Sequence, residues 1–178
     1  ENSGDDGRGD HSDEHRRRQP AHGQFMVDIT MVDGRTNKEE KNLYLTFSTV
    51  DKPAEIFSYD VNAGVYSQIT YFNKKLTEEV DIRPAEQMWV DGADGIPVHV
   101  FIVKPFGYEE YKKYPLVINV HGGPQMQWMD SFRGDWQVYP GSGYVVAFFN
   151  PHGSTGYGSK YTEAISKDWG GKVYEDVM

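Results

Sequence analysis

The sequence contains no cysteine, no long apolar run and no excess of positive charge. Without cysteine the chain has neither a disulfide framework nor thiolate chemistry. No apolar stretch approaches the roughly 20 residues that cross a bilayer, so we expect no membrane span. The formal net charge of -9 argues against a nucleic-acid partner, which needs a basic face. Hydrophobic residues at 38% and aromatic residues at 14% nevertheless suffice for a folded core.

Residues 1–24 differ from the rest because they are polar, glycine-rich and charged. We predict a disordered tail there. His11-Ser12-Asp13-Glu14-His15 matches the H-x-x-E-H zinc pattern, but it has no apolar helix face around it, so we interpret it as a chance match and predict no metal. The chain opens with Glu1 and shows no signal-peptide pattern. We expect both ends to be cut points, which leaves cytoplasmic and periplasmic localisation open.

Residues 25–80 show the pattern of short antiparallel strands. Alternating segments rich in β-formers occupy Leu43–Thr49, Glu55–Tyr59 and Val65–Phe72, and Asp60–Gly64 between the last two is typical of a hairpin turn. A propeller blade, a sandwich edge and a meander all fit one copy of this pattern. Lys74–Glu86 is interpreted as a polar connector.

Residues 81–178 show the order of elements that opens an α/β sheet. A hairpin comes first, then two apolar runs typical of buried strands, separated by a crossover with some helix, and finally short helical segments. The expected segments are Gln87–Val90 and Pro97–Lys104 for the hairpin, Leu116–Val120 and Tyr144–Phe149 for the buried strands, Gln125–Pro140 for the crossover, and Lys160–Lys167 and Tyr174–Met178 for the helices.

His121-Gly122-Gly123 directly follows the first buried strand. Glycine lets the backbone approach a substrate, and the N–H of Gly123 would then point at a carbonyl oxygen as an oxyanion-hole donor. Pro124 would stiffen the exit of this loop. The alternative is a glycine turn leaving a strand, with His121 packed beneath it.

The loop Asn150–Gly158 follows the second buried strand. Its glycines do not follow the order of a phosphate-binding loop. We expect a structured loop that His152 holds by a hydrogen bond, rather than a catalytic base at this position, with Tyr157 packed against the loop. The tryptophans at 128, 136 and 169 could line a pocket, although such residues are more often core.

Three motifs together resemble the prolyl oligopeptidase family of serine peptidases, and most closely its acylaminoacyl-peptidase and dipeptidyl-peptidase branches. They are Tyr114–Pro124, Asn150–Gly158, and Asp168-Trp169-Gly170-Gly171 with Tyr174-Glu175-Asp176-Val177. The likeness extends over roughly residues 101–178. The strands between Leu43 and Phe72 fit the last part of that family's propeller more loosely.

The resemblance implies an incomplete α/β-hydrolase fold, preceded by antiparallel strands from the end of a β-propeller. Residues 25–80 would be the end of the propeller and residues 81–178 the N-terminal part of the catalytic domain. It implies a serine peptidase that hydrolyses short peptides, releasing aminoacyl or dipeptidyl groups by acyl transfer, without metal or organic cofactor. His121, Gly122 and Gly123 would form the oxyanion loop. Because some branches carry a tyrosine where this chain has His121, a backbone donor is favoured here.

The family's serine lies in Gly-x-Ser-x-Gly, and the 178 residues contain no such pentapeptide. Ser142 and Ser154 each lack the first glycine of the motif. We therefore expect residues 1–178 alone to be inactive. A carboxylesterase-like α/β hydrolase and a non-catalytic binding module of the same fold remain as alternatives. Oligomeric state, the preferred side chain, and endopeptidase against aminopeptidase action stay open.

Overall fold

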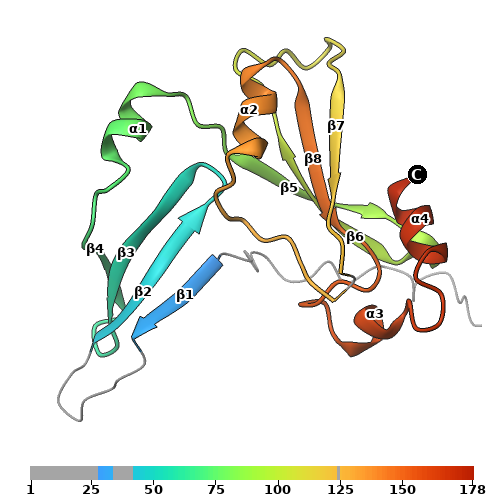
Figure 1. Ribbon diagram of the computed structural model, residues 1–178, viewed down its shortest axis with the longest axis horizontal. Helices are drawn as coiled ribbons and strands as arrows, with labels where there is room; N and C mark the ends of the chain where they lie inside the picture. Colours follow the sequence, from blue (N-terminus) through green and yellow to red (C-terminus); the bar gives the residue numbers. More distant parts are fainter. Residues whose placement is uncertain (1–27, 34–41, 124) are drawn as a thin grey trace, which may run out of the picture.

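The computed structural model describes residues 28–33, 42–123 and 125–178, the first of these ranges as backbone only. The predicted tail 1–24 with its H-x-x-E-H match, and the predicted role of Pro124, lie outside the described residues. Within them, the strands form two four-stranded sheets with short helices beside them (Figure 1).

The first sheet is antiparallel, with its strands in sequence order: β1 (Asp28–Asp33), β2 (Asn42–Thr49), β3 (Lys52–Asp60) and β4 (Val65–Gln68). The hairpin turn between β3 and β4 is the predicted one. The carboxylate of Asp60 accepts the amide N–H of Asn62 at 2.8 Å and of Ala63 at 2.9 Å, and Gly64 takes the left-handed conformation with φ +68°.

Three elements here differ from the sequence predictions. β4 ends at Gln68 rather than at residue 72, because the next two amides both turn back to the carbonyl of Ile56. The predicted polar connector contains a helix, α1 (Lys74–Glu79), with the exposed ion pairs Lys74–Glu78 and Lys75–Glu79 along its side. Such pairs support a short helix that buries nothing. β1 was not anticipated as a strand.

The second sheet contains the predicted hairpin and the two predicted apolar strands. Its strands are β5 (Ala85–Asp91), β6 (Pro97–Val103), β7 (Leu116–Val120) and β8 (Val145–Asn150), in the order β5-β6-β8-β7. β5, β6 and β8 pair antiparallel, whereas β7 and β8 are parallel and joined by a crossover through α2 (Asp135–Gly141). A parallel pair needs such a crossover.

Helices cover both faces of the second sheet. On the face below α2, Phe101 and Phe148 stack at 4.7 Å and Trp136 lies on Phe148 at 3.6 Å, all without solvent exposure. On the opposite face, α4 (Gly171–Val177) brings Val177 against a cluster around Val98. The alternation of β6 supplies both faces, since neighbouring side chains on a strand point to opposite sides.

β7 forms an edge of the sheet, and its side chains are less buried than the apolar run predicted. Leu116, Ile118 and Val120 are 56%, 46% and 40% exposed. β8, by contrast, has a partner on each side, because it lies between β6 and β7. Within the described residues, one side of β7 is thus open as a strand edge.

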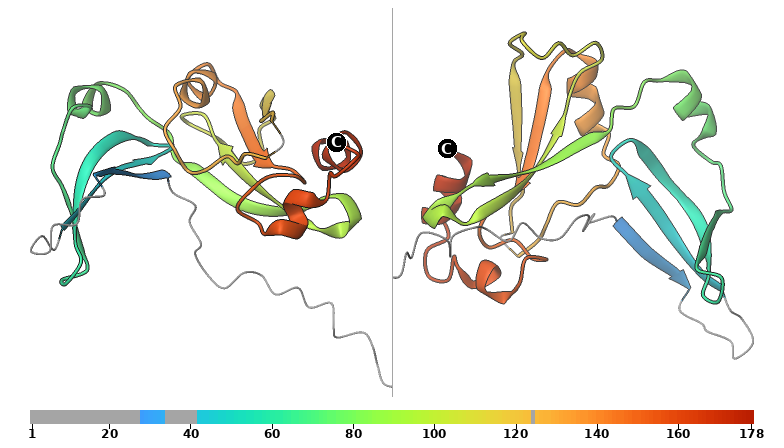
Figure 2. Two further views of the ribbon diagram at one scale, coloured as in Figure 1. Left: turned by 60° about the horizontal axis from the view of Figure 1, so that its bottom comes forward. Right: turned by 180° about the vertical axis from the view of Figure 1, so that it is seen from behind.

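The turn between β2 and β3 ties the two sheets together. Val50 at its tip is fully buried in the core of the second sheet. Its N–H donates to Asp130 at 2.7 Å, and its carbonyl accepts the side-chain amide of Gln137 at 2.8 Å. Both views in Figure 2 show this end of the first sheet directed at the second. One apolar side chain and a few polar contacts therefore orient the first sheet.

Candidate functional site

The glycine turn after β7 leaves open space beside its backbone. Gly123 takes a left-handed conformation with φ +56°, and a Cβ built at Gly122 or Gly123 would meet no atom within 4 Å. The described residues offer no hydrogen-bond acceptor to the N–H of Gly123. Gly123 also borders a cavity of about 520 Å³, lined on its other side by α3 (Ser159–Glu163) and the segment as far as Trp169. The N–H thus lies beside space for a ligand.

The ring of His121 braces this turn from below. Its Nε2 lies 2.9 Å from the Oγ of Ser154, and Ser154 donates its own proton to the carbonyl of Pro151 at 2.6 Å. Because a hydroxyl has one proton, the imidazole must donate through Nε2–H. Burial lowers the pKa of His121 below its ordinary value, which agrees with a neutral ring. The ring is therefore committed to the loop.

The contact between His121 and Ser154 is not a nucleophile–base pair. Ser154 is fully buried, and its proton points away from the imidazole. Ser142 follows α2 and donates to the carbonyl of Val138 at 3.0 Å, far along the chain from the turn. Neither serine has the exposure and orientation of an activated nucleophile.

Asn150 at the end of β8 fixes the segment that follows the glycine turn. Its Oδ1 accepts the N–H of Trp128 at 2.6 Å and its Nδ2 donates to the carbonyl of Trp128 at 2.9 Å. Nδ2 also donates to the hydroxyl of Tyr157 at 2.7 Å, so the predicted packing of Tyr157 against the loop is confirmed. One buried amide thus mimics a backbone pairing across two loops.

A second buried histidine, His99 on β6, extends this network to the sheet edge. Its Nδ1 lies 2.8 Å from the hydroxyl of Tyr157 and its Nε2 lies 3.1 Å from the Oε1 of Gln87. Burial lowers the pKa of His99 to about 4, so the ring is neutral at physiological pH. The sequence analysis missed it. The available signal was a histidine within an otherwise apolar strand.

His152 holds its loop by a hydrogen bond, as predicted. Its Nδ1 lies 2.7 Å from a carboxylate oxygen of Asp176, and both side chains are inaccessible to solvent. Nε2 is buried without a partner among the described residues, so a role as a catalytic base gains no support. Asp176 lies within the motif Tyr174-Glu175-Asp176-Val177, but its hydrogen-bond partner could not be inferred from the sequence.

The tryptophans divide between core and surface. Trp136 is core, as expected, and Trp128 packs edge-on against it at 5.1 Å. Trp169 is 72% exposed and borders the cavity beside Gly123, so the core interpretation is wrong for it. It lies in the segment ahead of α4, which has no further layer over it among the described residues.

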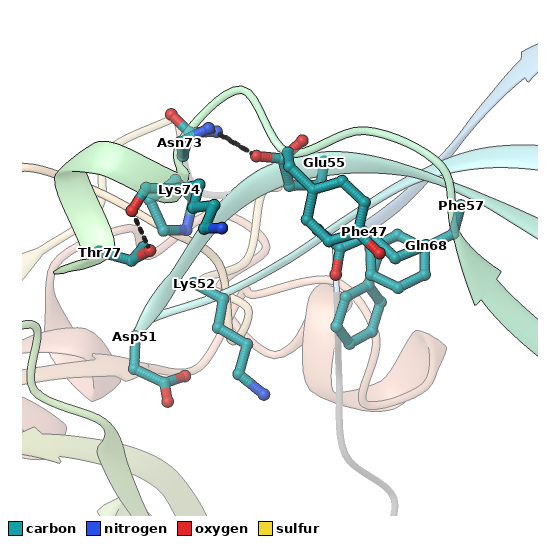
Figure 3. Close-up of a pocket in the computed structure, with 11 residues that line it drawn as sticks. Phe47, Asp51, Lys52, Glu55, Phe57, Gln68, Asn73, Lys74 and Thr77 are labelled. Carbon is teal, nitrogen blue, oxygen red and sulfur yellow. Dashed lines mark hydrogen bonds between the residues drawn. The ribbon is translucent and has the colours of Figure 1, made fainter.

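A second cavity, of about 380 Å³, lies between the first sheet and α1 (Figure 3). The carboxylate of Glu55 at its wall accepts hydrogen bonds from the hydroxyl of Thr70, the amide of Phe72 and both the amide and the side chain of Asn73. Burial alone would raise the pKa of Glu55, but these donors outweigh it and hold the pKa below its ordinary value. This carboxylate is therefore structural, since its acceptor sites face backbone and side-chain donors.

In the described part of the chain, no group of three His, Asp or Glu side chains could hold a metal ion. No helix among those residues has the length and apolar character needed to cross a bilayer.

The mixed sheet, with its parallel β7–β8 pair, covering helices and glycine turn at the end of β7, defines an α/β fold with a site at the carboxyl ends of parallel strands. Acylaminoacyl peptidase of Pyrococcus horikoshii has the same fold, with a TM-score of 0.69 and 24% identity over 78% of this chain and 22% of its own. A puromycin-hydrolyzing peptidase of Mycobacterium tuberculosis matches 76% of this chain and 22% of its own, with a TM-score of 0.64 and 26% identity.

Residues 116–178 match the prolyl oligopeptidase family. This part of the chain belongs to that family, which confirms the resemblance seen in the motifs. Dipeptidyl-peptidase 5 of Schizosaccharomyces pombe is 42% identical over 156 residues, which are 85% of this chain and 22% of the relative. The chain thus spans about a fifth of the length of the relatives that it matches.

Proposed function

We propose that the full-length gene product is a serine peptidase that hydrolyses short peptides by acyl transfer, and that the N–H of Gly123 is one donor of its oxyanion hole. The observation that carries this is the left-handed Gly123 at the end of β7, beside a cavity. Names of relatives that include dipeptidyl and acylaminoacyl peptidases support release of aminoacyl or dipeptidyl groups. In the same proposal, β1–β4 are the end of a propeller, residues 25–80, and residues 81–178 are the start of the catalytic domain.

In this mechanism a serine attacks the peptide carbonyl, a histidine takes its proton and returns it to the leaving amine, and the hole stabilises the tetrahedral oxyanion. The second donor would be the N–H that follows the serine. Since His121 is committed to Ser154, its side chain is unsuited to serve as a donor in place of a tyrosine hydroxyl, which supports a backbone donor. We also propose that residues 1–178 alone do not turn over peptides, because they contain no Gly-x-Ser-x-Gly.

The test compares two glycines that both have a positive φ and open space where a side chain would start. Gly123 and Gly143 have φ +56° and +86°, and both have open space where a Cβ would be built. An alanine at either position strains the backbone by about 1–2 kcal/mol. Gly123→Ala should lower kcat on dipeptidyl and aminoacyl p-nitroanilides about 10- to 100-fold by displacing the donor, with KM little changed. Gly143→Ala should keep wild-type kcat.

The same preparation separates the alternatives. Labelling of the full-length product by a fluorophosphonate, together with peptide hydrolysis, supports the peptidase. Hydrolysis of esters without peptides would instead indicate the carboxylesterase, and the absence of both labelling and turnover would indicate a binding module. Equal kcat values for the two alanine variants would refute Gly123 as an oxyanion donor.

A further inference from the structure

The carboxylate of Asp176 joins three segments that are far apart in sequence. Oδ1 accepts the N–H of Ala93, in the 3-10 turn of the β5–β6 hairpin, at 2.8 Å. Oδ2 accepts the backbone N–H of His152 at 2.6 Å and lies 2.7 Å from the Nδ1 of the same residue. Asp176 itself lies on α4. A buried carboxylate is costly unless its charge is compensated, and here three N–H groups converge on it.

The histidine of this pair donates to the carboxylate through Nδ1. An ionised carboxylate only accepts hydrogen bonds, so Nδ1 carries a proton. Nε2 is buried and without a partner among the described residues. The ring lies flat against Tyr161 at 4.6 Å, and the hydroxyl of Tyr161 donates to the carbonyl of Asn150 at 2.7 Å. His152 is therefore held from one edge and one face.

The loop held by His152 is hydrogen-bonded through Ser154 to His121, which precedes the glycine turn. Ser154, two residues further on, accepts the Nε2–H of His121 at 2.9 Å and bonds back to Pro151 at 2.6 Å. Gly153 between them has φ +95°, and a Cβ there would lie 2.5 Å from the Cδ1 of Ile165. The segment 150–154 is buried throughout. The position of His152, which Asp176 holds, therefore affects the position of Ser154 two residues further on.

We propose that Asp176 and His152 are positioning residues for the oxyanion loop, acting through Ser154 and His121 on the placement of the Gly123 N–H. This inference rests on the proposed peptidase function and deepens it. α4 thereby has a part in the geometry of the site, although none of its residues lines the cavity beside Gly123.

The test uses the full-length gene product and five single substitutions, Ser154→Ala among them. His152→Leu removes the Nδ1 donor, whereas His152→Asn places an amide N–H near the position of Nδ1. Asp176→Asn turns an acceptor into a donor that opposes Ala93 and His152. Asp168→Asn is the matched control, because it makes the same charge change at an exposed site. There the carboxylate of Asp168 accepts the amide N–H of Gly171 at 3.0 Å.

His152→Leu and Asp176→Asn should lower kcat about 10- to 100-fold with KM changed less than about threefold, since a misplaced donor costs transition-state and not ground-state binding. His152→Asn should recover most of this loss, and Asp168→Asn should match the wild type. Ser154→Ala should reproduce the kcat loss. The double variant that combines Ser154→Ala with His152→Leu should be no slower than the slower of the two single variants, because both substitutions act on one path.

Three outcomes would overturn the inference alone. Each presupposes an active wild-type enzyme. The first is that His152→Leu and Asp176→Asn have the same kcat as Asp168→Asn. The second is that the losses in kcat multiply in the double variant, and the third is a rise in KM without a fall in kcat. If His152→Leu or Asp176→Asn does not fold, by far-UV circular dichroism, Ser154→Ala decides, and a wild-type kcat for it refutes the path. A wild-type product that neither hydrolyses peptides nor reacts with a fluorophosphonate refutes the proposed function, and with it the inference.

Discussion

The two sheets of this chain are stabilised in different ways. The second sheet has stacked aromatic rings on one face, an aliphatic cluster on the other, and buried polar side chains gathered where β7 and β8 end. The first sheet buries few side chains and depends on the carboxylate of Glu55 in β3 and on Val50 in the adjoining β2–β3 turn. In the second sheet, apolar packing is in contact with the polar residues that shape the candidate site, since the ring of His99 lies 4.4 Å from that of Phe101. A substitution in one sheet should therefore act differently from its counterpart in the other.

The largest effect should come from the aromatic stack. Trp136→Ala removes a fully buried ring that lies on Phe148 at 3.6 Å, and losses for such substitutions are about 3–5 kcal/mol. Trp169→Ala is the matched control, since that ring is 72% exposed and should change stability by less than about 0.5 kcal/mol. Urea unfolding followed by far-UV circular dichroism measures both. Similar losses for the two variants would mean that the stack does not dominate the second sheet.

The buried His99 should make the second sheet sensitive to acid. In the unfolded chain the imidazole has its ordinary pKa of 6.5, whereas in the folded chain burial lowers the pKa to about 4. Between pH 6.5 and pH 4 the unfolded state therefore binds more protons than the folded state. The free energy of unfolding falls as pH drops through this range. The loss from this group amounts to at most about 3 kcal/mol.

His99→Asn isolates this contribution, because an amide does not titrate. The stability difference between wild type and variant should shrink as pH falls through this window, as measured by urea unfolding at fixed ionic strength. Parallel curves for the two proteins would show that His99 does not carry the effect. Burial lowers the pKa of His121 as well, so the variant should keep part of the pH dependence.

In the first sheet, a comparable loss should come from a polar group. Glu55→Gln replaces one oxygen by an NH2 group that opposes either the N–H of Phe72, which bonds Oε2, or the N–H of Asn73, which bonds Oε1; hydrogen bonds to charged groups are worth about 1.5–3 kcal/mol. Because the pKa of Glu55 is lowered, this advantage is present above its ordinary value of 4.5 and is lost as pH falls through the folded pKa. Glu78→Gln, at an exposed ion pair on α1, should change stability by less than about 0.5 kcal/mol. Equal effects would mean that Glu55 is no more than a surface carboxylate.

The sequence predicted the second sheet better than the first for a physical reason. β6 and β8 are apolar strands covered on both faces, and β7 is an apolar run beside them, so period and composition identify all three. β4 is a half-exposed strand that ends because two amides turn back to Ile56, which no periodicity records. α1 buries nothing, so it has no apolar stripe to detect.

In the candidate site, the sequence indicated the glycine turn and the loop but not the contacts between them. His121, Gly122 and Gly123 were predicted as the oxyanion loop, and the left-handed conformation of Gly123 fits that prediction without testing it. The pairing of His152 with Asp176 joins residues 24 positions apart through a helix whose placement the sequence does not encode locally. Buried polar pairs of this kind need the fold before they can be predicted, because their donors and acceptors come from separate elements.

The smallest of these effects should come from the link between the sheets. Val50→Ala removes two methyl groups from a fully buried position, and about 0.8 kcal/mol per buried carbon gives a loss of about 1.5 kcal/mol. Val61→Ala, at a turn where the side chain is 54% exposed, is the matched control and should be nearly silent. Hydrogen exchange should show the structural result, with the amide of Val50, which donates to Asp130, becoming less protected while the amides of β6 keep their protection. If β6 lost protection as well, the two sheets would unfold as one unit, and the first sheet would be part of the second sheet's core rather than attached to it.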